Sequence, residues 1–180
     1  RRILEIKFRL GLFENPFFDE SAVKETLLAE EHKAVALDAA RKSIVLLGNN
    51  GILPLTDGAR YKKIFVTGPN ANSQGLMGDW TFPQPDENVI TFIEGLRMIA
   101  PLTQFTYLEQ GESIRYMDPA KVRKAGEMAR QADLSIVFAG EYVNRKDWVN
   151  KTSGEDVERG NLNLPGLQEE LIRNILASGK

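Results

Sequence analysis

Apolar and polar positions alternate along this chain in blocks that predict strands and helices in turn. Short apolar runs, typical of buried strands, occupy residues 43–47, 63–68, 105–108 and 134–140. Apolar residues at helical spacing predict helices over residues 21–41, 88–99, about 118–132 and 167–176. Strands that alternate with helices favour an α/β fold, with a mainly parallel sheet flanked by helices in a three-layer sandwich.

Two further stretches bound this pattern. Arg1 to Leu10 resembles the end of a helix that Gly11 terminates, and an aromatic connector follows over residues 12–18. Residues 52–55 read as an edge segment, because Pro54 cannot donate to a strand ladder. The sequence closes on a helix and a glycine stop where the alternation calls for another strand, so we expect a fragment of a longer protein, with a sheet that is incomplete at the C-terminus.

Composition narrows the chemistry. A net charge of −2 gives no reason to expect nucleic acid as a partner, and no apolar run reaches the roughly 20 residues that cross a bilayer. The chain has no cysteine and one histidine, His32, which excludes disulfides, thiolate ligands and paired histidines. We therefore expect no cofactor, no metal and no membrane partner.

The polar segment from Thr152 to Gly166 is the first candidate for a functional site. It follows the predicted strand at residues 134–140 and precedes the last helix. In open α/β sheets, ligands bind where loops leave the carboxyl ends of the strands. A surface loop whose acids face water is the alternative interpretation, since many long loops are no more than that.

This segment is rich in carboxylates, which can serve as general acids when neighbouring charges make them hold a proton near neutral pH. The candidates are Glu141, Asp147, Glu155, Asp156 and Glu158, and their spacing does not distinguish among them. A nearby cation, Arg159, would favour ionisation of any acid that it touched. We therefore expect it to order the loop or to meet a different group.

A second candidate loop contains Trp80, after Gly78 and Asp79. An indole presents a flat apolar face with an N–H at its edge, which suits the C–H faces and hydroxyls of a sugar. A tryptophan that covers the core is an equally good interpretation, and the same two interpretations apply to Trp148 and Tyr142. By contrast, Gly68-Pro69-Asn70 lacks either glycine-rich phosphate-binding motif, which argues against nucleotide binding.

Several blocks, in order and spacing, resemble glycoside hydrolase family 3, which includes many β-glucosidases and β-xylosidases. The run from Ala39 to Leu47 with the Asn49–Leu55 segment, Val66 to Ala71 and Leu76 to Trp80 are similar to successive parts of that family's second domain. Ser153-Gly154-Glu155, then Arg159, then Leu162-Asn163-Leu164-Pro165 resemble the loop that carries its acid/base glutamate.

The resemblance implies a barrel domain followed by an α/β sandwich domain and a retaining mechanism. Residues 1–20 would then be the tail of the barrel and the linker, and residues 21–180 the first part of the sandwich domain. By position, Glu155 matches the acid/base and Trp80 an aromatic of the leaving-group subsite, while Trp148 and Arg159 are further predicted substrate contacts. The expected partners are an oligosaccharide or glycoside substrate and the upstream barrel, which would carry the aspartate nucleophile.

The resemblance leads to one further expectation and leaves one alternative. A chain without the nucleophile should have no glycosidase activity alone. A protein of a different class, a non-catalytic carbohydrate-binding or scaffolding module with the same fold, is the alternative, and the function of Glu155 would distinguish the two.

Overall fold

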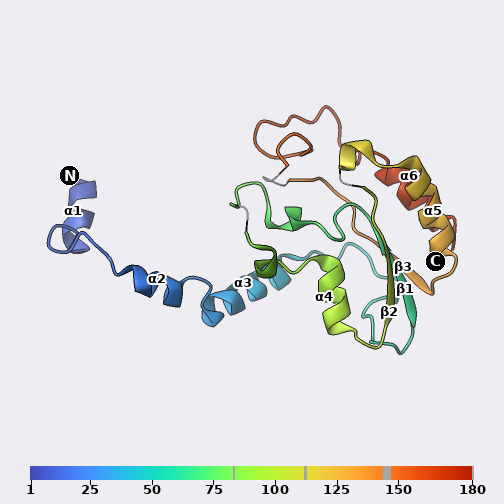
Figure 1. Ribbon diagram of the computed structural model, residues 1–180, viewed down its shortest axis with the longest axis horizontal. Helices are drawn as coiled ribbons and strands as arrows, with labels where there is room; N and C mark the ends of the chain where they lie inside the picture. The colour runs from blue at the N-terminus through green and yellow to red at the C-terminus, as the bar shows by residue number, and fades with distance from the viewer. Residues whose placement is uncertain (83, 112, 144–146, 180) are drawn as a thin grey trace. The chain divides into compact units, whose positions relative to one another are not determined.

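The computed structural model describes residues 1–82, 84–111, 113–143 and 147–179. The chain divides into two compact units, Arg1–Gly51 and Ile52–Lys180, each described here by itself (Figure 1). The predicted domain boundary after residue 20 stays a prediction.

The first unit holds three helices, α1 (Arg2–Arg9), α2 (Glu20–Thr26) and α3 (Glu30–Ser43). The helix predicted at the N-terminus is confirmed, and Gly11 after it has a left-handed φ of 67°. The single helix predicted over residues 21–41 is wrong, because Leu27 is extended and Leu28 takes a φ of 59°. Summed helix propensity does not register such a break, and the acidic first turn of α3 favours a new start after it.

The strand predicted at residues 43–47 is also wrong. Ser43 ends α3, and Ile44 to Leu47 are exposed and belong to no strand of the described chain. β-branched composition predicts a strand only where a neighbour supplies hydrogen bonds. Residues 52–55 likewise form no strand.

The second unit is built on a parallel sheet in the order β2-β1-β3. Its strands are β1 (Lys63–Thr67), β2 (Gln104–Leu108) and β3 (Leu134–Val137), so these three predicted strands are confirmed. Phe65 at the centre of β1 pairs with Thr106 and Ser135 on either side. At the amino end, the Asp133 carboxylate accepts the backbone N–H groups of Lys62 and Lys63, both at 2.9 Å.

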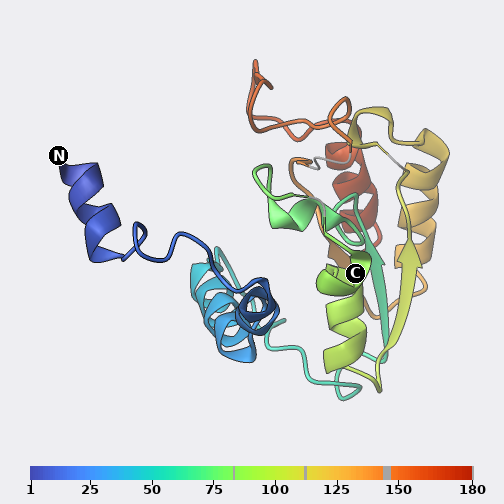
Figure 2. The same cartoon turned by 60° about the vertical axis from the view of Figure 1, so that its left-hand side comes forward.

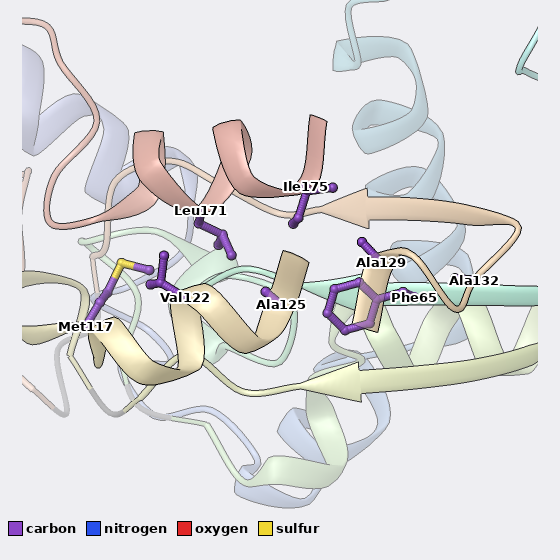
Figure 3. Close-up of a cluster of buried hydrophobic side chains, with 8 residues drawn as sticks. All are labelled: Phe65, Met117, Val122, Ala125, Ala129, Ala132, Leu171 and Ile175. Atoms are coloured by element: carbon purple, nitrogen blue, oxygen red, sulfur yellow. The ribbon is translucent and has the colours of Figure 1, made fainter. Parts of the chain in front are cut away.

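Helices cover both faces of this sheet (Figures 1 and 2). Phe65 packs against α5 (Pro119–Ala129) and α6 (Gln168–Leu176) in a buried cluster, which Figure 3 shows. Ile64 and Val66 point to the other face and pack with Ile93 of α4 (Phe92–Ile99). This alternation along β1 is the period of a strand, and it confirms the predicted helix–sheet–helix layers.

Local signals set the helix ends more sharply than apolar spacing did. α5 begins at Pro119 with Asp118 as its cap, as predicted. α4 begins at Phe92, not at Asn88, because Thr91 and Glu94 form a capping box. The Glu94 carboxylate accepts hydrogen bonds from the Thr91 backbone N–H, which has the larger effect, and from the Thr91 hydroxyl. Both lower the pKa of Glu94 from its usual value. The described ranges also contain the short 3₁₀ turns η1 (Gln74–Met77), η2 (Asp86–Asn88) and η3 (Ile114–Tyr116).

Candidate functional site

The loops after β1 and β3 are joined at the carboxyl end of the sheet. The Asn70 backbone N–H donates to the Phe138 carbonyl at 3.2 Å, and its side-chain amide donates to the Glu141 carbonyl at 3.2 Å. Gly68 has a φ of 106°, and a Cβ there would lie 2.3 Å from the Phe138 oxygen. A close approach of two backbones therefore explains this glycine, with no phosphate ligand required.

One buried side chain closes the base of the long loop after β3. The Gln168 amide accepts from the Gly140 N–H at 2.8 Å and donates to the carbonyls of Gly140 and Pro165, both at 2.9 Å. Since Gly140 begins the loop and Pro165 is near its end, Gln168 holds both ends at the start of α6. The two ends of this loop are therefore held together.

Lys151 of that loop and Asp79, which precedes Trp80 in the loop after β1, form a buried ion pair. The Lys151 ammonium lies 3.2 Å from Asp79 Oδ1, and the two side chains are 0% and 10% exposed. The Asp79 carboxylate also accepts the Glu155 backbone N–H at 2.8 Å. The loop with Trp80 and the loop with Glu155 are therefore held together through one carboxylate, and we call the triad of Asp79, Lys151 and the Glu155 N–H the Asp79 clamp.

Two aromatic and polar contacts support the lysine of the clamp. Its ammonium lies 3.5 Å from the centroid of the Trp148 ring, within the range of a cation–π interaction. Its backbone carbonyl accepts from the Arg115 guanidinium at 2.9 Å. Trp148 thus stacks on a buried cation with one face and remains 43% exposed.

Arg159 is held from the other end of the same loop. Its Nε lies 3.3 Å from Glu141 Oε1, and its guanidinium donates to the Asn163 carbonyl at 2.5 Å. The Thr152 hydroxyl donates to Glu141 Oε2 at 2.5 Å and accepts the Tyr142 N–H at 2.8 Å. Glu141 therefore connects Arg159 to a buried threonine, so this carboxylate has a structural task.

The four predicted site residues are brought to one loop system. The carboxylate of Asp79, the residue before Trp80, accepts the Glu155 backbone N–H. The Trp148 ring lies against the Lys151 ammonium, and Arg159 forms an ion pair with Glu141. The side chains of Glu155 and Trp80 are exposed, the latter at 74%. Sequence reasoning missed the roles of Asp79 and Lys151, because the ion pair joins residues that are 72 positions apart.

Gly154 allows a sharp test of the Asp79 clamp. It has a φ of 103°, and a Cβ there would lie 2.6 Å from Asp79 Oδ2. We expect Gly154→Ala to cost about 1–3 kcal/mol and to displace the Glu155 segment, because the added methyl group meets the carboxylate and the backbone is strained. Chemical denaturation measures this loss. Gly160→Ala is the control, since nothing lies within 4 Å of its added carbon, and equal losses in both variants would contradict the prediction.

Residues 1–82, 84–111, 113–143 and 147–179 contain no group of three or more histidine, cysteine or acidic side chains arranged to hold a metal ion. Among the helices of those ranges, none has the length and apolar character to cross a bilayer.

Comparison with known proteins adds the family. The "Glycosyl hydrolase family 3 C-terminal domain" sequence model matches residues 44–180. A β-xylosidase of Formosa agariphila is 31% identical over 99% of this chain and 24% of its own length. A lysosomal β-glucosidase of Dictyostelium discoideum is 31% identical over 78% of this chain and 19% of its own length.

A solved structure agrees with these sequence matches. A β-glucosidase from intestinal bacteria, involved in saponin metabolism, superposes with a TM-score of 0.82 at 28% identity, over 99% of this chain and 27% of its own. The chain thus spans about a quarter of the length of such relatives. With most of its length matched in sequence and fold, the chain belongs to glycoside hydrolase family 3, and residues 44–180 correspond to that family's C-terminal domain.

Proposed function

We propose that this chain supplies the general acid/base of a retaining β-glycosidase that releases terminal β-linked glucose or xylose. The Asp79 clamp is the observation that carries the proposal. Its carboxylate holds the Glu155 backbone at 2.8 Å while the Glu155 side chain stays exposed. A proton donor must be fixed at its base and accessible at its carboxyl group, and Glu155 meets both requirements.

The other loop carboxylates are less suited to this role. Glu141 is engaged by Thr152 and Arg159, so its oxygens are committed to holding the loop. Asp147 accepts the side-chain amide of Asn150 at 3.0 Å. Of the set that sequence spacing left open, Glu155 is the acid whose main chain is fixed by a buried ion pair.

Substrate contacts would surround this acid. We infer that Trp80, next to Asp79 in the chain, receives the C–H face of the leaving-group sugar. Trp148, supported from beneath by Lys151, is a second platform, and Arg159 would donate to sugar hydroxyls with the N–H groups that Glu141 and Asn163 leave available.

The nucleophile is proposed to lie outside this chain, on the upstream barrel domain that the family resemblance implies. A retaining glycosidase needs two carboxyl groups about 5–5.5 Å apart, on opposite sides of the sugar ring. Asp156 and Glu158, the acidic neighbours of Glu155, extend from the same loop and would approach from the same side. The two-carboxylate site would therefore be completed only by the second domain.

This division of labour predicts that the 180-residue chain alone has no glycosidase activity. Incubation with nitrophenyl β-glucoside and β-xyloside tests it, with a known β-glucosidase as the positive control. Turnover that a single change at Asp156 or Glu158 abolishes would place a nucleophile within this chain and refute the proposal.

Trp80→Ala in the intact enzyme is expected to raise KM for a disaccharide about tenfold while changing KM for nitrophenyl glycosides little, because the aryl group uses the leaving-group subsite less. Steady-state kinetics on both substrates give the ratio, and thermal unfolding gives the structural control. Loss of thermal stability with an unchanged ratio would mean that the indole only covers the fold.

A further inference from the structure

A polar cavity lies apart from the four predicted site residues, at the carboxyl ends of β1 and β2. Its volume is about 340 Å³, at the small end of ligand pockets. Its wall is formed by the end of β2, the loops after β1 and β2, and the 3₁₀ turns η1 and η2, with Tyr142 at the edge of the acidic loop. Among the described lining residues, none is Glu155, Trp80, Trp148 or Arg159.

One lining residue has an unmet hydrogen bond. Gln110 is 1% exposed, and its Nε2 donates to Thr67 Oγ1 at 2.7 Å. That threonine hydroxyl in turn donates to the Leu108 carbonyl at 2.8 Å, which fixes the orientation of the amide. The Gln110 Oε1 is buried without a donor among the described residues. A buried acceptor without a partner is costly and rare, so this oxygen calls for a donor, and Gln110 itself lies in the cavity wall.

The charges of the wall define the class of ligand. Two carboxylates, Asp86 and Glu109, line the cavity, and the lining residues that the structure describes include no lysine or arginine. The Lys121 ammonium lies 3.8 Å from Glu109 Oε2. Asp86 already accepts a hydrogen bond from the side-chain amide of Gln74. Among the described residues, no group of three or more histidine, cysteine or acidic side chains could hold a metal ion. A neutral ligand rich in hydroxyl donors fits this wall.

Aromatic side chains complete it. Tyr107 and Tyr142 line the cavity beside the polar groups, and phenol rings accept the C–H faces of sugars. Burial, and secondarily the charge of Glu109, raise the pKa of Tyr107. Its hydroxyl thus stays protonated as a donor for a ligand oxygen, while the carboxylates and Gln110 accept.

From the cavity, its wall and the buried Gln110 oxygen that lacks a donor among the described residues, we propose a second carbohydrate site here, sized for one neutral sugar unit and separate from the acid/base loop. It does not depend on the role of Glu155. The site would hold a sugar while the loop system from Trp80 to Arg159 handles the bond that is cleaved.

Isothermal titration of the full chain with xylose and with glucose tests the proposal, and a Kd of about 1 mM is expected for a unit of this size. Gln110→Leu should weaken binding about tenfold, since one buried hydrogen bond is lost. Tyr107→Phe, which removes only the hydroxyl, should weaken it several-fold and guards against misfolding of the first variant. Glu87→Gln is the matched control for Asp86→Asn, because Glu87 neighbours Asp86 but does not line this cavity.

The outcomes separate the two sites. Binding that Tyr107→Phe and Asp86→Asn weaken, and that Glu87→Gln leaves unchanged, supports the cavity. Binding lost in Trp80→Ala but kept in the cavity variants would place the sugar at the acid/base loop and overturn this inference, leaving the proposed function standing. No binding at 50-fold above the expected Kd would overturn it as well.

Discussion

Glu155→Gln in the intact glycosidase is expected to slow the hydrolysis of disaccharides by about 10²–10⁴-fold, the typical contribution of general acid catalysis. A glutamine keeps the shape of the side chain and the backbone N–H that Asp79 holds, but its amide cannot act as a general acid. Nitrophenyl glycosides should lose much less in their first step, since a nitrophenolate leaves without protonation. Comparing kcat/KM for both substrate classes measures the difference.

Asp156→Asn is the matched control for this experiment. Asp156 is the next residue, is also exposed, and has a left-handed φ of 59° that asparagine tolerates. It should retain the wild-type ratio between the two substrate classes. Equal slowing of both classes by Glu155→Gln, or no slowing, would remove Glu155 from the acid/base role and favour a non-catalytic carbohydrate-binding module.

Lys151→Met is expected to destabilise the second unit by about 3–5 kcal/mol, because it leaves the Asp79 carboxylate buried without its cation. The thioether replaces the volume of the lysine stem but not the charge. It also removes the cation beneath the Trp148 ring. Urea denaturation followed by tryptophan fluorescence measures the change, and it should appear as a lower midpoint with an unchanged slope.

Two further variants test the cause of this loss. Lys121→Met removes a cation 3.8 Å from Glu109, in a pair whose side chains are 36% and 63% exposed, and should cost at most about 1 kcal/mol. Combining Lys151→Met with Asp79→Asn should recover part of the stability, because the amide carries no charge yet can still accept the Glu155 N–H. A double variant as unstable as the sum of both single variants would show that the ion pair is not the stabilising contact.

Much of the fold was predictable because it rests on short-range patterns. The apolar run at Lys63–Thr67 predicts a buried strand wherever its neighbours lie, and Asp118-Pro119 predicts a helix start from capping chemistry alone. The same reasoning failed at residues 43–47, because a strand needs hydrogen-bond partners that local sequence does not supply. It also failed at Leu28, where no glycine or proline marks the break between α2 and α3.

The candidate site divides in the same way. Residue types and spacing were sufficient to predict the family resemblance, the loop that carries Glu155, and Trp80 as a candidate sugar contact. The folded structure was needed to show that Asp79 and Lys151 form a buried pair that joins the two loops. It was also needed to show that Gln110, which lines a separate cavity, has a buried oxygen without a donor among the described residues. Desolvation and hydrogen-bond satisfaction depend on residues far apart in the chain, so they emerge only once the chain has folded.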